Sequence, residues 1–245
     1  MRRARREVEV IQPSRRSLVI LAAFLVAYEN VVTVVTGGEL FFSVPAALAI
    51  AATLVVVMIG SSRRFNLTLA EVGISRHRAA RGAAIGLAVA AVVAGLAVLS
   101  LRSGLLVPGP VEYSPFASMT VGEVLLRAWI WVPLATVLPE ELSFRGVLLA
   151  LLRRRYPDAR AAVLSAVPFA LWHALIIVHT VSRTSLAERG ETWAIGIVGG
   201  FAAVAIGGWL FAQLRIRSGS LITSIACHWA FNGSILIGLY ALQRG

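Results

Sequence analysis

The chain has 245 residues and a mean hydropathy of +0.81, and only 14% of its residues are charged. Because a soluble domain carries about 25% charged residues, this composition excludes an ordinary soluble protein and predicts a polytopic membrane protein. The net charge is +11, and all 23 basic residues are arginine. These arginines fall in short loops between apolar runs, which argues against a nucleic-acid partner. The single cysteine, Cys227, excludes an intrachain disulfide.

Seven runs are apolar enough to cross a bilayer, which takes about 20 residues. In chain order they are approximately residues 17–36, 41–59, 82–101, 121–152, 161–181, 193–214 and 220–242. The sequence therefore predicts an all-α bundle with about seven or eight transmembrane helices. Residues 1–16 are predicted to be a basic cytoplasmic tail, and residues 17–245 a single membrane-embedded domain.

The arginines also predict the orientation of the bundle. With the N-terminus inside, 17 arginines fall in inner segments and 4 in outer segments. Cytoplasmic loops carry an excess of basic residues, so we expect a cytoplasmic N-terminus and an external C-terminus.

The fourth run is longer than a simple span. It contains Pro133 and Pro139, and we expect it either to tilt or to break at Pro139, where proline suits the first turn of a new helical segment. The inner loop at residues 61–81 mixes apolar residues with arginines, which predicts an amphipathic element on the inner membrane surface. The outer loop at residues 102–120 contains three prolines and is predicted to be irregular.

Three of the runs carry ionisable groups in their interiors, where such groups are costly and usually functional. Glu140 lies 13 residues from Arg153, His173 lies 13 from Arg160, and His228 lies 11 from Arg217. At 1.5 Å per residue these groups are roughly 20, 20 and 17 Å from the inner edge. The common depth predicts a single site.

Helical spacing divides the polar residues of this site. Glu141 and Arg145 are four apart and can form an ion pair on one helix face. His228 and Asn232 are also four apart and can reach one ligand. Glu140 is rotated by about 100° from Glu141, so we expect Glu141–Arg145 to be structural and Glu140 to be free for chemistry.

These residues resemble three motifs of the CAAX-protease and bacteriocin-processing (CPBP, or Abi) family of intramembrane glutamic endopeptidases, which includes the type II CAAX prenyl endopeptidases. The motifs are E-E-x-x-x-R, F-x-x-x-H and H-x-x-x-N, and they occur in the family's order on separate spans. In this chain they are Glu140, Glu141 and Arg145, then Phe169 and His173, then His228 and Asn232. The resemblance implies a catalytic core at about residues 121–242, and the first three spans match only by being hydrophobic.

The resemblance also implies a mechanism. Glu140 would act as general base, and His173 would help to bind and polarise the attacking water. His228 and Asn232 would donate hydrogen bonds to the oxyanion, while Glu141, Arg145 and Phe169 support the site. No cofactor is needed for this chemistry. The alternative is a zinc site with Glu140, His173 and His228 as ligands and an open water position, although no H-E-x-x-H motif supports it.

Other polar and small residues have simpler expected roles. Glu29 and Asn30, inside the first run, are expected either to hydrogen-bond across helices or to line the cavity. Trp172 and Trp229 adjoin motif histidines and are expected either to wall the cavity or to pack. The glycine-rich sixth run predicts close helix packing rather than a nucleotide loop.

The sequence thus predicts an integral membrane endopeptidase that cleaves a membrane-associated or CAAX-like peptide. Its partners are a peptide or membrane-protein substrate and membrane lipids, with no nucleic acid. The arginine-only basic composition favours a bacterial cell membrane. The alternative is a non-catalytic bacteriocin-immunity or scaffold membrane protein with the same fold, and a third hypothesis is a proton-coupled transporter.

Overall fold

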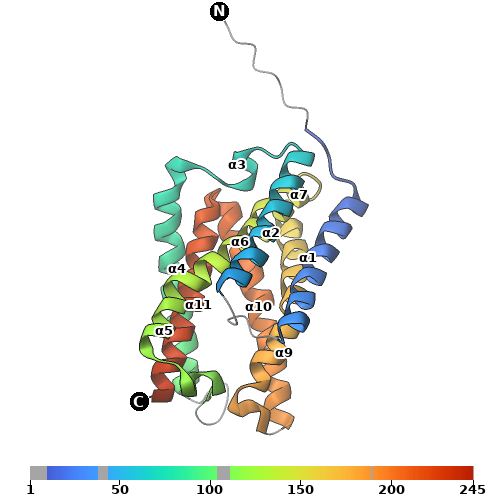
Figure 1. The fold of residues 1–245 in the computed structure, drawn as a ribbon. Helices are drawn as coiled ribbons and strands as arrows, with labels where there is room; N and C mark the ends of the chain where they lie inside the picture. The colour runs from blue at the N-terminus through green and yellow to red at the C-terminus, as the bar shows by residue number, and fades with distance from the viewer. Residues whose placement is uncertain (1–9, 38–43, 104–110, 189, 245) are drawn as a thin grey trace, which may run out of the picture.

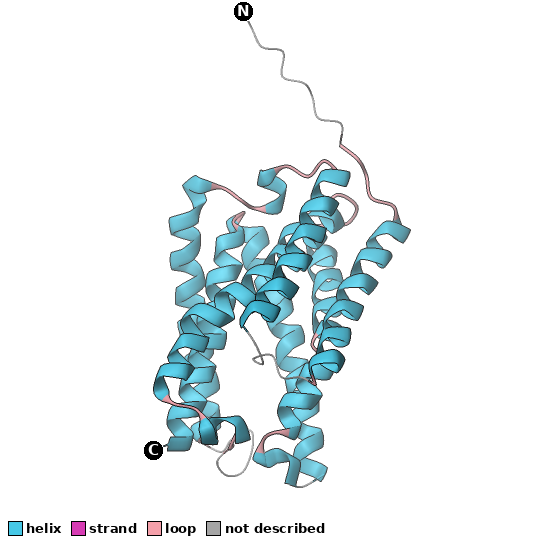
Figure 2. Cartoon of the chain, viewed as in Figure 1, coloured by secondary structure: helices cyan, strands magenta, loops and turns pink. Residues whose placement is uncertain are grey.

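The computed structural model describes residues 10–37, 44–103, 111–188 and 190–244, and helices dominate this part of the chain (Figures 1 and 2). Two short 3₁₀ helices, η1 (Ser114–Ser118) and η4 (Ser185–Glu188), lie in the connections. The α-helices are α1 (Arg15–Thr36), α2 (Val44–Arg64), α3 (Leu69–Val72), α4 (Arg76–Arg102), α5 (Val121–Leu126), α6 (Leu138–Glu141), α7 (Leu149–Arg153), α8 (Asp158–Trp172), α9 (Ala174–Ser182), α10 (Gly190–Ser218) and α11 (Leu221–Arg244).

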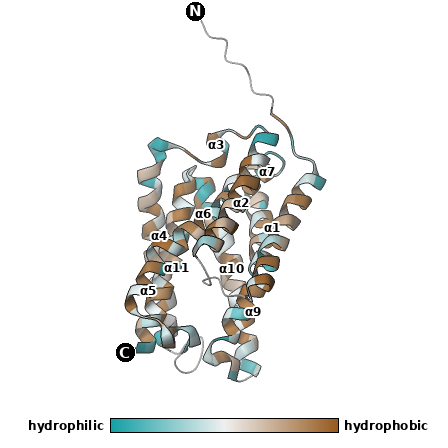
Figure 3. Cartoon of the chain, in the orientation of Figure 1, coloured by the Kyte–Doolittle hydropathy of each residue, from teal (hydrophilic) through white to brown (hydrophobic). Residues whose placement is uncertain are grey.

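The predicted all-α membrane bundle is confirmed. In the described part of the chain, six helices are long and apolar enough to cross a membrane, and seven if the bent pair α8–α9 counts as one span. The helices are hydrophobic over much of their length (Figure 3), and large apolar side chains such as Val56, Val35 and Val198 are 67–78% exposed. Lipid would cover such a surface. Most of the predicted tail, residues 1–9, lies outside the described residues.

The fourth run forms one long helix that crosses the bundle obliquely (Figure 1). Between α5, α6 and α7 it widens into two π-helical segments, η2 (Arg127–Val137) and η3 (Leu142–Leu148). The hydrogen bonds at their ends, from Leu138 N to Pro133 O and from Leu149 N to Phe144 O, reach back five residues. Of the two expected outcomes, the break at Pro139 is therefore wrong, because the wider winding lets the helix continue past both prolines.

The fifth run bends instead. Helices α8 and α9 meet at His173 with an angle of 46°. Pro168, inside α8, has no N–H to donate, but the helix continues beyond it as far as Trp172. The interruption therefore comes at the histidine, four residues from Phe169.

The inner loop is anchored to the end of the bundle. Thr68 and Glu71 form a capping box at the start of α3, and Glu71 also pairs with Arg154 at 2.7 Å. The Arg154 guanidinium donates further bonds to the carbonyls of Phe65 and Asn66. Leu69 remains 66% exposed next to this polar contact, so α3 has the mixed character that the sequence predicted.

Close helix packing in the sixth run occurs at only some of its glycines. A Cβ added to Gly208 of α10 would lie 2.8 Å from Phe169, and one added to Gly200 would lie 2.8 Å from Ile177. A Cβ on Gly199 would meet nothing within 4 Å. The glycines on one face of α10 therefore allow α8 and α9 to approach it closely.

Candidate active site

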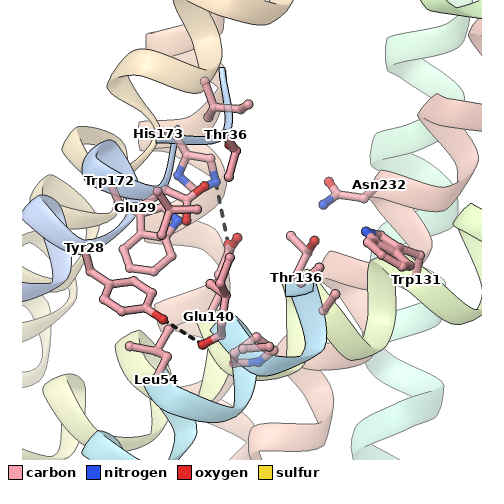
Figure 4. Close-up of a pocket in the computed structure, with 17 residues that line it drawn as sticks. Tyr28, Glu29, Thr36, Leu54, Trp131, Thr136, Glu140, Trp172, His173 and Asn232 are labelled. Carbon is pink, nitrogen blue, oxygen red and sulfur yellow. Dashed lines mark hydrogen bonds and ion pairs between the residues drawn. The ribbon is translucent and has the colours of Figure 1, made fainter. Parts of the chain in front are cut away.

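A cavity of about 200 Å³ opens between α1, α2, the long oblique helix, the α8–α9 bend and α11 (Figure 4). Glu140, His173 and Asn232 face it, as the motifs predicted. Its other lining residues are Tyr28, Glu29, Val32, Thr36, Ala47, Ile50, Ala51, Leu54, Trp131, Ala135, Thr136, Pro139, Trp172 and Ile176.

Glu140 and His173 lie together at one side of this cavity. Glu140 Oε2 is 3.6 Å from His173 Nε2, and Trp172 lines the same cavity. Oε2 itself is buried and has no hydrogen-bond partner among the described residues. Polar atoms 3.6 Å apart are suited to a bridging water, and a buried carboxylate oxygen requires a donor.

The tautomer of His173 follows from its second contact. Nδ1 lies 2.8 Å from the carbonyl oxygen of Phe169. Because a carbonyl only accepts, Nδ1 carries the proton and donates it. In the neutral ring, Nε2 is then an acceptor that faces Glu140 and the cavity.

Glu141 and Arg145 form the expected ion pair, with both side chains fully buried and Oε1 3.0 Å from Nη1. The same oxygen accepts a 3.0 Å hydrogen bond from His228 Nδ1. Arg145 also donates to Gly208 O at 3.1 Å, and its guanidinium lies 3.9 Å from the centre of the Phe169 ring. One buried carboxylate therefore connects the long helix to α11, while its cationic partner connects the helix to α8 and α10.

His228 and Asn232 differ in how they meet the cavity. Asn232 lines it, across from His173 in Figure 4. His228 is 4% exposed, is not among the lining residues, and stacks on Phe211 with ring centres 4.7 Å apart. Since its Nδ1–H is bonded to Glu141, Nε2 can donate only when the ring carries a second proton. The Asn232 amide can donate in any protonation state.

This geometry can be compared with known proteins. Residues 122–234 match the family described as Type II CAAX prenyl endopeptidase Rce1-like. This segment, a little under half of the chain, is therefore similar to the Rce1-like family. No match was found among curated proteins or among solved structures. The Rce1-like match implies a membrane endopeptidase of the CAAX-protease type and covers most of the predicted core at 121–242.

Several cavity residues lie outside the Rce1-like segment. Glu29 and Tyr28 come from α1, and Ile50 and Leu54 from α2. Sequence reasoning left Glu29 undecided between two roles, and the structure places it on the cavity wall. It did not single out Tyr28, whose hydroxyl donates to Ile50 O at 2.7 Å. The signal that could have identified Tyr28 is its position next to Glu29, a carboxylate inside an apolar run.

The two tryptophans beside the motif histidines have different positions. Trp172 lines the cavity and stacks on Tyr28 at 6.1 Å between ring centres. Trp229 is not among the lining residues and donates to Ala128 O at 2.9 Å. Of the two tryptophans, only Trp172 is therefore part of the cavity wall.

The proposed zinc ligands do not converge. In the described part of the chain, no group of three His, Cys, Asp or Glu side chains is arranged to hold a metal ion. Glu140 meets His173, but His228 is only 4% exposed and is not among the residues that line the cavity. The donor set therefore does not fit a two-histidine, one-carboxylate zinc site, and we derive no step through a metal.

Proposed function

We propose that this protein is an intramembrane endopeptidase that hydrolyses a peptide bond of a membrane-associated or CAAX-like substrate with water activated by Glu140 and His173. The observation that carries the proposal is the buried, unpaired Oε2 of Glu140, 3.6 Å from the acceptor nitrogen of His173. A water between them donates one hydrogen to each. Its oxygen lone pairs then remain free to attack a carbonyl carbon.

The remaining steps use groups on the other side of the cavity. As water adds, Glu140 takes its proton as general base, and the carbonyl oxygen becomes an oxyanion. The Asn232 amide, which lines the cavity, donates to that oxygen; His228, four residues earlier on the same helix, is bonded to Glu141. When the C–N bond breaks, the proton held by Glu140 passes to the departing amine. Glu141 and Arg145 keep His228 and the long helix in position.

The test is cleavage of a fluorogenic library of membrane-anchored and CAAX-like peptides by the purified protein. Glu140→Ala and His173→Ala should each lower kcat by about 10²-fold or more, the usual contribution of general base catalysis. Glu123→Gln is a matched control, because glutamine preserves the capping box with Thr120 at the far end of the same helix. His77→Ala, in an exposed position, controls for the histidine. Full cleavage by both cavity variants would refute the assignment.

A further inference from the structure

The α8–α9 bend leaves backbone groups that a continuous helix would pair. In an α-helix, Leu175 N–H would donate to Leu171 O, four residues earlier. At the bend this bond is absent. There the helical pattern is interrupted, and His173 N–H donates to the carbonyl three residues earlier, Ala170 O, at 3.2 Å. Unpaired backbone groups inside a membrane cost several kcal/mol each, so the bend requires other partners.

Asn30 of α1 supplies those partners. Its Nδ2 donates to Leu171 O at 3.0 Å, and its Oδ1 accepts from Leu175 N at 3.1 Å. One carboxamide therefore replaces the missing bond from both sides, immediately before and after His173. The same Nδ2 is 2.7 Å from Val26 O, one turn earlier in α1, which fixes the orientation of the amide.

The bend in turn determines how the His173 ring is held. In a continuous helix, the backbone N–H of His173 would occupy Phe169 O. Here that carbonyl accepts the ring Nδ1–H at 2.8 Å instead. At the bend the ring Nδ1–H thus takes the place of the backbone donor at this carbonyl, and Nε2 faces Glu140.

We propose that Asn30 is a positioning residue of the active site, which holds the α8–α9 bend open and so keeps Nε2 of His173 directed at Glu140. The inference rests on the proposed function for its catalytic consequence. It also makes α1, which lies outside the family-matched residues 122–234, part of the site. Asn30 itself does not line the cavity, whereas its neighbour Glu29 does.

The first test separates turnover from substrate binding. In Asn30→Leu, which has similar size and no hydrogen-bonding group, kcat should fall at least 10-fold while KM changes less than 3-fold. Ser165→Ala is the control, because it removes another buried interhelical bond of α8, to Phe144 O at 3.1 Å, away from the bend. Loss of kcat in both variants to the same extent would overturn the proposal.

The second test does not depend on activity. Nitrogen-15 NMR of histidine-labelled protein in micelles should show the His173 ring protonated at Nδ1 in the wild type and in Ser165→Ala. Asn30→Leu should shift it toward a mixture of tautomers. Asn30→Ser, which keeps a polar side chain too short to reach both backbone groups, should do the same if the leucine variant does not fold. An unchanged His173 signature in a folded Asn30 variant would overturn the proposal, even if no substrate is ever cleaved.

Discussion

Glu140 and Glu141 are adjacent in the chain, but their carboxylates contact different groups. Glu141 is fully buried and meets Arg145 and His228. Glu140 faces the cavity with one oxygen unpaired. Removing either partner of a buried ion pair leaves an uncompensated buried charge, so we assign Glu141 a structural role. Glu140 retains the freedom that a proton acceptor requires.

Removing Arg145 should therefore destabilise the fold. Arg145→Met leaves Glu141 as a buried carboxylate without its cation, which typically costs about 3–5 kcal/mol. The measurement is the free energy of unfolding in mixed micelles titrated with denaturing detergent. The double variant Glu141→Gln, Arg145→Met should be more stable than Arg145→Met alone, because no lone charge remains. Arg160→Met, an exposed site, should change stability by less than about 0.5 kcal/mol; equal losses at both arginines would contradict this account.

The donor geometry predicts that catalysis does not depend on zinc. Because His228 does not line the cavity with Glu140 and His173, the site offers a glutamate–histidine pair rather than three converging ligands. Elemental analysis of active protein should give well under one zinc per chain, and cleavage should persist in a chelator. Stoichiometric zinc whose removal abolishes activity, and whose return restores it, would show that the ligands rearrange to hold the metal.

At the scale of single residues, the sequence predicts some of the contacts in the site but not all of them. The common depth of Glu140 and His173 and the four-residue spacing of Glu141 and Arg145 follow from helix geometry alone. The bond between His228 and Glu141 does not, because it depends on the rotation of α11 against the long helix. For the same reason, the sequence could not show that Asn232 lines the cavity while His228 does not.

At the scale of elements, two departures from α-helical winding shape the site. The π segments η2 and η3 flank α6, which carries Glu140 and Glu141. The α8–α9 bend presents His173. Prolines in the sequence indicate that winding will be disturbed nearby, but not how. Whether a helix widens, bends or breaks depends on which neighbours pair the freed backbone groups, and those neighbours come from distant parts of the chain.

Helix α10 offers a matched test of close packing. Gly208→Ala places a Cβ 2.8 Å from Phe169, the aromatic ring over Arg145, and should destabilise the protein by about 1–3 kcal/mol through overpacking. Gly199→Ala, on the same helix but in open space, should be neutral or stabilise by up to about 1 kcal/mol, since alanine favours the helix. Unfolding of both variants in mixed micelles checks this. Equal effects would mean that α10 is not closely packed at Gly208.

At the scale of the whole molecule, polar contacts fasten both ends of the bundle. At one end, Arg154 joins α7 to Glu71 of α3. At the other, Arg244 of α11 donates to carbonyls of the η1 segment, among them Phe116 O at 3.0 Å. Between these ends the helices are mostly hydrophobic (Figure 3), and many large apolar side chains are exposed. The hydropathy pattern predicts this division, whereas the pairing of α1 with the α8–α9 bend requires the three-dimensional arrangement.

The orientation of the bundle in the membrane remains a prediction from the arginine distribution. The α3 end, near the start of α1, should face the cytoplasm, and the η4 end should face outward. Cys227 is 1% exposed, so it should contribute little background to cysteine labelling. In intact cells, an impermeant maleimide should label Ala187→Cys, exposed within η4, and should not label His77→Cys, exposed at the start of α4. After the cells are opened both should react, which controls for reactivity. Labelling of His77→Cys alone in intact cells would invert the bundle and place the inner-end arginines outside.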